Sequence, residues 1–162
     1  MEIQKTQDLA SRLQAFHNGT ELRAWEWMGA HRVVKDGQEG VQFCLWAPHA
    51  ADVSVIYEKN GWLRELSPMT RMAEDAAFWT CFLPDIERYD CYKYSIRTND
   101  GQVFDKSDPF AFYAEVRPAN ASRYYPLDGY VWSDADWIKR RSLAPEPVNI
   151  YEVHLGSWQT KE

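Results

Sequence analysis

Apolar and polar residues alternate with a period of two through the middle of the chain. In the segment 41–47 the alternation places Val41, Phe43 and Leu45 on one face. The same period recurs in the segments 52–57, 78–84 and 91–97, and a further strand starts at 102–105. Because successive side chains of a strand point to opposite faces, each segment is predicted to be a strand with one face in a core.

Turn signals separate these strands. Asp36-Gly37, Asn60-Gly61 and Asn99-Asp100-Gly101 are typical of tight turns. Shorter strand candidates lie at 63–66 and 121–124. Short alternating strands with no helical pattern between them favour a mostly β fold, an antiparallel sandwich of immunoglobulin-like (E-set) type. A parallel α/β sheet is disfavoured because its strands would be separated by helices.

The pattern before these strands is helical. Leu9, Leu13 and Phe16 recur at a spacing of three to four residues, as on one face of a helix. Asn18-Gly19 then supplies a stop signal. We expect a short N-terminal helix over 5–17.

Two stretches lack a clean period. The first, 21–40, is expected to connect the helix to the sandwich. The second, 108–141, is rich in proline, aspartate and aromatic residues and is expected to be irregular chain, followed by a stiff proline spacer at 144–147. The segment 149–158 alternates again like a strand. It either adds to the sandwich or is the first strand of a further domain, and the second interpretation is favoured.

Composition and charge exclude several function classes. Hydrophobic residues make up 45% and charged residues 26% of the chain, which is typical of a globular protein. The net charge of -6 argues against a nucleic-acid partner and fits a neutral ligand. His17, His31 and His49 are widely spaced, so no metal site is predicted. No signal-type segment and no run of roughly 20 apolar residues is present, so a cytoplasmic protein without a membrane partner is expected.

Cysteine and tryptophan add two expectations. The chain has an odd number of cysteines, Cys44, Cys81 and Cys91, and they lack CxxC spacing. This argues against a disulfide framework and against a thiolate metal site, so we expect buried reduced thiols. Aromatic residues reach 15%, including eight tryptophans. Tryptophan can stack on sugar rings, but it also fills cores and domain interfaces. For any single tryptophan here, the packing role is favoured.

Several segments follow, in order, the sequence of a known family. Residues 16–31 (FHNGTELRAWEWMGAH) resemble the FHxGTxxRAYxxLGAH opening of bacterial glycogen branching enzymes, and 41–56 resemble their GVxFxVWAPNAxxVSVV. The other matches are NGW at 60–62, YKYSI at 92–96, KSDPFAF at 106–112, RPANAS at 117–122 and IYEVHLGSW at 150–158. From about residue 16 onward, the chain is therefore similar to the N-terminal region of 1,4-α-glucan branching enzymes of glycoside hydrolase family 13.

The resemblance implies a layout of domains. Residues 1–32 would be an N-terminal helix and connecting segment, and 33–125 an immunoglobulin-like module of carbohydrate-binding family 48. Residues 126–162 would be a linker and the start of a catalytic (β/α)8 barrel, with IYEVHLGSW as the first barrel strand. The catalytic barrel of the same polypeptide would then be the partner of the module.

The resemblance also implies a reaction. The family cleaves an α-1,4 glucan bond and re-attaches the segment through an α-1,6 bond, by a retaining double displacement that uses an aspartate nucleophile and a glutamate acid/base. These carboxylates belong to later barrel strands. We therefore assign no catalytic residue and expect the 162 residues alone to be inactive.

The carboxylates and histidine near the end of the chain are interpreted as structural. Glu152 and His154 share one face of the terminal strand and resemble a catalytic pair, but this strand carries no catalytic carboxylate in the family. Asp134 and Asp136 are expected to be solvated or to cap a helix.

Sugar-binding members of the module family share three features, of which this sequence has two. Trp62 follows the Asn60-Gly61 turn, and Lys93 lies in the YKY strand. The third position, after the next turn, is Val103, which offers no flat stacking face, and Phe104 would point to the opposite face of the strand. Weak α-glucan binding by Trp62, Lys93 and Asn60 therefore competes with a purely structural role, which Val103 favours.

Two rival hypotheses follow from the same sequence. A free-standing glycan-binding or regulatory module is one, but the strand 150–158 would then expose an unpaired apolar edge. The front module of a debranching enzyme or a trehalose-forming hydrolase is the other. None of these hypotheses requires a cofactor, and none is predicted.

Overall fold

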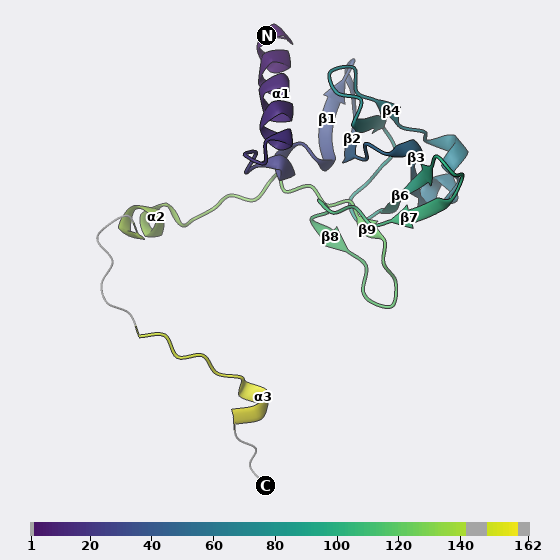
Figure 1. The fold of residues 1–162 in the computed structure, drawn as a ribbon. Coiled ribbons are helices and arrows are strands. Elements are labelled where there is room, and N and C mark those ends of the chain that lie inside the picture. The colour runs from purple at the N-terminus through teal and green to yellow at the C-terminus, as the bar shows by residue number, and fades with distance from the viewer. Residues whose placement is uncertain (1, 142–148, 159–162) are drawn as a thin grey trace. The chain divides into compact units, whose positions relative to one another are not determined.

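Antiparallel strands dominate the first part of the computed structural model, which describes residues 2–141 and 149–158 (Figure 1). One sheet has the order β1-β2-β5-β4, from β1 Gly29–Lys35, β2 Gln38–Trp46, β5 Phe78–Leu83 and β4 Thr70–Arg71. The other has the order β3-β6-β9-β8, with β7 also paired to β6, from β3 Ala50–Tyr57, β6 Cys91–Thr98, β7 Val103–Lys106, β8 Tyr113–Ala114 and β9 Ser122–Arg123. The predicted antiparallel, mostly β fold is confirmed.

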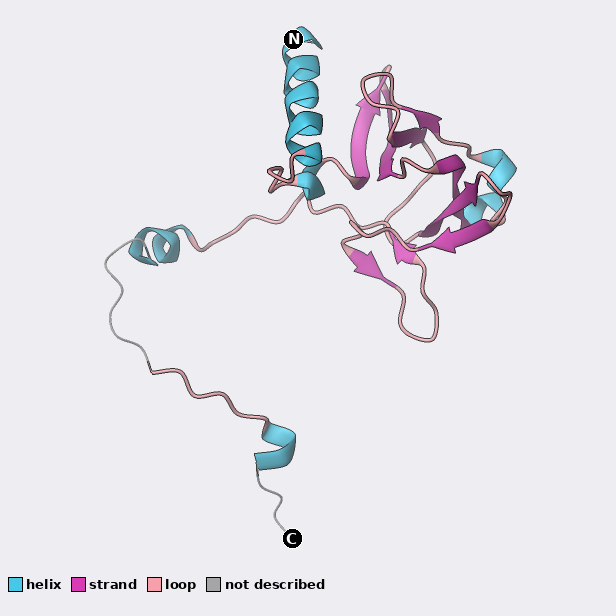
Figure 2. Cartoon of the chain, in the orientation of Figure 1, coloured by secondary structure: helices cyan, strands magenta, loops and turns pink. Residues whose placement is uncertain are grey.

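Helices are few in the described residues, and α1 is the longest of them (Figure 2). They are α1 Glu2–His17, α2 Ala135–Arg141 and α3 Leu155–Trp158, with 3-10 helices η1 Ala24–Glu26, η2 Glu58–Asn60 and η3 Arg64–Leu66. The predicted N-terminal helix is therefore confirmed, and it ends at His17, two residues before Gly19, where the backbone turns left-handed with φ 70°. Within the described chain, no helix has the length and apolar character needed to cross a bilayer.

The core lies between the two sheets and uses the faces that the alternation predicts. Phe43 on β2, Val53 and Val55 on β3, and Tyr92 and Tyr94 on β6 are all buried. The rings of Phe43 and Tyr92 meet edge to face with centroids 5.1 Å apart. Because both sheets contribute alternate residues to one cluster, burial of these side chains is the main source of stability.

Helix α1 covers part of the outer face of the first sheet. Leu13 of α1 forms a second buried cluster with Met28, Cys44 of β2 and Phe78 of β5. Phe16 packs against Phe78 with ring centroids 5.2 Å apart. The apolar face predicted for the N-terminal helix is thus the one that contacts the sheet.

The first strand is a correction to the sequence analysis. Residues 29–35, predicted as part of a connecting stretch, form β1, which pairs with β2 from Gly29↔Cys44 to Lys35↔Gln38. The hairpin turn is Asp36-Gly37, whose φ angles of 51° and 82° match a two-residue turn. β1 lies at the edge of its sheet and buries few side chains, so its own residues give a weak periodic signal.

The predicted strand at 63–66 is also wrong. Arg64–Leu66 form the 3-10 helix η3, because the carbonyl of Leu63 accepts a hydrogen bond from the Asn60 amide (3.2 Å) instead of joining a ladder. The candidate strand at 121–124 is confirmed by β9, whereas the two-residue strands β4 and β8 were not predicted.

Asp108 anchors the irregular stretch that follows β7. Its carboxylate accepts hydrogen bonds from the hydroxyls of Tyr92 (2.7 Å) and Tyr94 (3.3 Å) and from the backbone N–H of Phe110 (2.8 Å). Its own N–H donates to Ser122 Oγ at 2.8 Å. Burial raises the pKa of Asp108 above its ordinary value, against the opposing effect of these hydrogen bonds. The segment with no clean period is therefore tied to the core by this buried carboxyl group and by the pairing of β9 with β6.

Residues Leu127–Glu162 form a separate unit from Met1–Pro126. Asp134 precedes α2 and Asp136 lies in its first turn, where negative charge is favourable. In the described part of this unit, Tyr151–His154 have no strand partner and Leu155–Trp158 form α3, so the strand predicted at 149–158 is not formed here. A strand takes its hydrogen bonds from a neighbour, and its assignment to a barrel stays a prediction. The spacer 144–147 lies outside the described residues.

Candidate functional site

Trp62 projects from the loop that follows β3. Its indole is 40% exposed, and its backbone has φ 61°, directly after Gly61 with φ 67°. The Trp62 N–H donates to the carbonyl of Tyr57 at 3.0 Å, which closes the turn. A bulky residue with positive φ is uncommon and costs on the order of 1 kcal/mol or more, so the surrounding structure must hold it in place.

Asn60 is the residue that holds this loop. It is buried, and its side-chain oxygen accepts a hydrogen bond from the N–H of Tyr57 at 3.0 Å. Its amide nitrogen donates to the carbonyls of Val55 (3.3 Å) and Leu63 (3.2 Å) and to Ser67 Oγ (3.2 Å). These contacts occupy both ends of the amide, so Asn60 positions the turn that carries Trp62.

Lys93 lies beside Trp62 on the outer face of the second sheet. It is paired with Ile56 across β3 and β6, and its ammonium nitrogen lies 6.0 Å from the centroid of the Trp62 ring. An ammonium group at this distance from an indole face is attracted by it. The fold therefore brings together two of the residues that the sequence singled out, one from a loop and one from a strand.

The third of the features shared by sugar-binding members, an aromatic residue after the second turn, is absent. Val103 pairs with Arg97, which places it on the same sheet face as Lys93, four strand positions along, at about 13 Å. Phe104 pairs with Ile96 and so lies on the opposite face, as the alternation predicts, with Lys106 Nζ 5.4 Å from its ring centroid. On this face Trp62 therefore offers one aromatic stacking surface, and Val103 supplies no second ring.

Charged residues occupy the far end of the same face. Asp52 accepts a hydrogen bond from Arg97 Nε at 2.5 Å and forms an ion pair with Arg64. A cavity of about 340 Å³ lies beside this group. The sequence analysis did not single out these three residues, although each occupies a polar position within a predicted strand segment (52–57, 63–66 and 91–97). Their mutual pairing favours a role in holding η3 against the sheet.

Thiols and histidines show no sign of reactive or metal chemistry in the described residues. Cys44, Cys81 and Cys91 are free, and burial raises the pKa of the first two to about 12 and of the third to about 11. Of the described His, Cys, Asp and Glu side chains, no group of three is placed to hold a metal ion. Three of the four histidines have separate hydrogen-bond partners, which are Asp75 for His17 (2.5 Å), the Met28 carbonyl for His31 (2.8 Å) and Ser157 for His154 (2.9 Å).

The pair of Trp62 and Lys93 contains no carboxyl group, so by itself it supplies no acid/base residues for glycoside cleavage. Retaining glycoside chemistry needs two carboxyl groups about 5 Å apart and open to the substrate. Asp108, whose pKa is raised, lies buried among tyrosine hydroxyls, and Glu152 is exposed. What the Trp62 and Lys93 pair offers is one flat apolar face and one hydrogen-bond donor, which suits a neutral sugar ring.

Comparisons with known proteins identify the family of the chain. Residues 27–111 match the family model described as Carbohydrate-binding module 48 (Isoamylase N-terminal domain). The 1,4-alpha-glucan branching enzyme GlgB of Parasynechococcus marenigrum is 43% identical over 146 residues, which cover 88% of this chain and 19% of that protein. The GlgB of Halothermothrix orenii is 45% identical over 150 residues, covering 91% of this chain and 24% of that protein. The chain thus spans about a fifth to a quarter of the length of these curated relatives.

A solved structure supports the fold. A Salmonella typhimurium protein, named as a candidate alpha amylase, superposes with a TM-score of 0.51 at 20% identity, over 68% of this chain and 17% of that one. At this level of identity the likeness concerns the sandwich fold alone.

Proposed function

This chain belongs to the carbohydrate-binding module 48 family, and from that premise we propose that it is the N-terminal accessory module of a 1,4-α-glucan branching enzyme. The proposal is supported by relatives of that name that are 43% and 45% identical over at least 88% of the chain. The alignments, 146 and 150 residues long, extend beyond the 93 residues of the module proposed at 33–125. We assign the branching reaction to the rest of such a polypeptide, and we propose a cytoplasmic location.

The module is proposed to hold α-glucan weakly at Trp62 and Lys93. The observation that carries this proposal is the Lys93 ammonium 6.0 Å from a Trp62 ring that is presented on a left-handed backbone. The indole would stack on a glucose ring while the ammonium donates a hydrogen bond to a hydroxyl. Asn60 would position the turn rather than contact the sugar. With Val103 at the third position, one stacking surface is missing, so the affinity is expected to be low.

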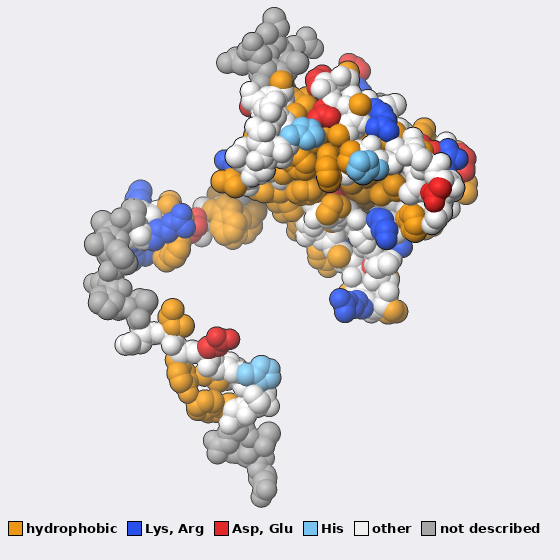
Figure 3. Space-filling model, viewed as in Figure 1, with side chains coloured by type: hydrophobic (Ala, Val, Ile, Leu, Met, Phe, Trp, Pro, Cys, Tyr) orange, Lys and Arg blue, Asp and Glu red, His pale blue; other side chains and the backbone are white. Residues whose placement is uncertain are grey.

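We also propose that the module packs on a catalytic barrel of the same polypeptide. In the unit that follows the sandwich, Tyr130, Trp132 and Ile150 are 68%, 73% and 89% exposed, and such apolar surface is usually covered in a complete protein. Apolar side chains also gather on the face of the first unit that is shown in Figure 3. In this layout the module occupies 33–125 and the linker 126–162, leading into the barrel.

Affinity electrophoresis tests the binding site. The chain is run in native gels with and without glycogen, next to Trp62→Ala and Lys93→Met. We expect glycogen to retard the unmodified chain, Lys93→Met to reduce the retardation and Trp62→Ala to reduce it further. Trp25→Ala is the matched control, because Trp25 is 45% exposed at another place on the surface and should leave migration unchanged.

The result that contradicts the binding site is equally clear. If the unmodified chain and Trp62→Ala migrate alike at high glycogen, the face of Trp62 and Lys93 does not bind glucan. The module would then have a structural role in the enzyme.

A further inference from the structure

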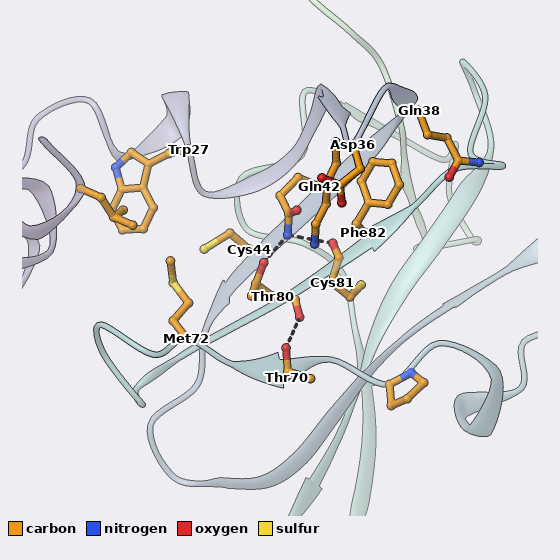
Figure 4. A pocket seen from close by; sticks show the side chains of 13 residues that line it. Trp27, Asp36, Gln38, Gln42, Cys44, Thr70, Met72, Thr80, Cys81 and Phe82 are labelled. Atoms are coloured by element: carbon orange, nitrogen blue, oxygen red, sulfur yellow. Dashed lines mark hydrogen bonds between the residues drawn. The ribbon is translucent and has the colours of Figure 1, made fainter. Parts of the chain in front are cut away.

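A second cavity lies on the opposite side of the sandwich, on the outer face of the sheet β1-β2-β5-β4 (Figure 4). It has a volume of about 670 Å³, within the range of small-ligand sites. We call it the sheet groove, and the lining residues used below are Trp27, Gln42, Thr70, Thr80 and Phe82. They come from the segment before β1 and from strands β2, β4 and β5.

Aromatic rings lie at both ends of the sheet groove. Trp27 is fixed at one end by ring contacts with Phe16 (5.9 Å) and Phe78 (5.4 Å). At the other end, the Phe82 ring lies over Gly40, where a Cβ atom would approach Phe82 Cζ to 2.5 Å. The absence of a side chain at Gly40 therefore leaves room for the phenyl ring to pack against β2. The Phe82 ring is thus held against β2, and because the Lys35 ammonium lies 5.9 Å from its centroid, a ligand that stacks on the ring would displace the flexible lysine side chain.

Neutral polar groups lie between the two rings. The amide nitrogen of Gln42 donates to the carbonyl of Cys81 at 3.0 Å and to the hydroxyl of Thr80. Because its nitrogen is used in this way, Gln42 presents its carbonyl oxygen as an acceptor. The hydroxyl of Thr70 donates to the carbonyl of Thr80 at a long 3.3 Å, so it is easily redirected toward a ligand.

This lining suits a neutral, polyhydroxylated ligand. Lys35 and Asp36, of opposite charge, are the charged residues that line the groove, and Lys35 lies over Phe82 at 5.9 Å. For an anionic ligand the lining supplies one basic side chain, Lys35, which Asp36 offsets, and a purely apolar ligand would cover the carbonyl oxygen of Gln42 without offering it a hydrogen-bond donor. Sugar rings satisfy both demands, since they stack on aromatic rings and exchange hydrogen bonds with amides and hydroxyls.

We propose that the sheet groove is a second α-glucan site, independent of Trp62 and Lys93. The choice of α-glucan rests on the proposed function, because the similar enzymes are named for that polymer. The two sites lie on different sheets, so one module would hold two glucan segments. Two weak sites on one body bind a polymer more tightly than either alone, through effective concentration.

Nuclear magnetic resonance of the isotope-labelled chain separates the two sites. Maltoheptaose is titrated into the Trp62→Ala variant, and the indole N–H of Trp27 and the side-chain amide of Gln42 are followed, after assignment with Trp27→Phe and Gln42→Ala. We expect both signals to shift with saturation. Cellohexaose, which has β linkages, should shift neither, and equal shifts with it would contradict the α-glucan assignment.

Two variants in the Trp62→Ala background test the contacts. Phe82→Leu keeps Gly40 covered but removes the flat ring, and it should weaken binding about tenfold. Phe104→Leu is the matched control, since Phe104 is a 41% exposed phenylalanine outside the groove, and it should change nothing. Thr70→Val removes one hydroxyl at an exposed position and should weaken binding about fivefold, which serves as the test if Phe82→Leu unfolds.

The outcomes distinguish the two proposals. One outcome is that maltoheptaose shifts the Trp62 signal in the unmodified chain but does not shift the Trp27 and Gln42 signals in Trp62→Ala. The sheet groove is then not a site, and the proposed function stands. Folded Phe82→Leu and Thr70→Val proteins that bind as tightly as their background would also overturn it. Shifts at Trp27 and Gln42 without any at Trp62 would uphold the groove and contradict the first site.

Discussion

The two outer faces of the sandwich position their candidate binding residues by different means. On one face, Trp62 depends on an irregular loop that one buried side chain, Asn60, holds together through four hydrogen bonds. On the other, the sheet groove is built on paired strands, where the register Gln42↔Phe82 and Cys44↔Thr80 sets the positions. In a pair of strands, many backbone hydrogen bonds together hold the side chains in position. The loop face should therefore be sensitive to single substitutions beyond the contact residues, and the strand face tolerant of them.

The thiols of the two faces provide the largest expected contrast. Cys44 and Cys81 line the sheet groove, and burial raises the pKa of each from 9.0 to about 12, whereas Cys91 on β6 is raised to about 11. The thiolate is the reactive form of cysteine. Compared with an ordinary thiol of pKa 9.0, the thiolate fraction at pH 8 should therefore be about a thousandfold smaller for the groove thiols and about a hundredfold smaller for Cys91. Alkylation with iodoacetamide, followed by peptide mass spectrometry, measures each thiol.

The pH dependence has a definite sign. An acid whose pKa is raised by folding keeps its proton in the folded state, so the stability it contributes is present below pH 9 and is lost as pH rises toward 12. Alkylation in urea is the control and should show three ordinary thiols. Fast labelling of Cys81 in the folded protein would mean that the groove floor is open to water, and it would weaken the contrast between the faces.

Removal of Asn60 should disrupt the loop face strongly. Asn60→Ala leaves the N–H of Tyr57 and the carbonyl of Val55 without their partner in a buried region, so we expect a loss of about 3 kcal/mol in the free energy of unfolding. Urea denaturation measures it. Asn99→Ala is the control, because exposed Asn99 makes one hydrogen bond to the His49 carbonyl, and it should cost about 0.5 kcal/mol or less. Equal losses for the two variants would refute the dependence of the loop on Asn60.

Strain at the turn should give the smallest effect. Gly61→Ala places a side chain on a backbone with φ 67°, which should cost about 1 kcal/mol and displace Trp62. Gly37→Ala is matched, because Gly37 has φ 82° and open space around it, and it lies in the β1–β2 hairpin. Both variants should lose similar stability by thermal unfolding, but retardation by glycogen should fall for Gly61→Ala alone. A similar fall in both would mean that the loop adjusts without Gly61.

Much of the strand pattern could be predicted because it is local. The alternation in 41–47 and 91–97 selects Phe43, Tyr92 and Tyr94 for the core, and the structure buries these residues. The two-residue rule for strands also places Lys93 and Phe104 on opposite faces, as observed. Edge strand β1 and the loop at 63–66 were not predicted, since pairing with β2 and the hydrogen bonds of Asn60 decide their conformations.

The sequence by itself determined the antiparallel sandwich, the N-terminal helix, the resemblance to branching enzymes and the choice of Trp62 and Lys93. All of these depend on short-range periodicity or on contiguous motifs, which a linear sequence displays directly. The tertiary structure alone decided that Asn60 is buried beneath Trp62 and that Trp27, Gln42 and Phe82 line one groove. Trp27, Gln42 and Phe82 are far apart in the chain and come together only once strand pairing has closed the loops between them, and the burial of Asn60 depends on its contacts with Val55 and Ser67 on either side of the turn.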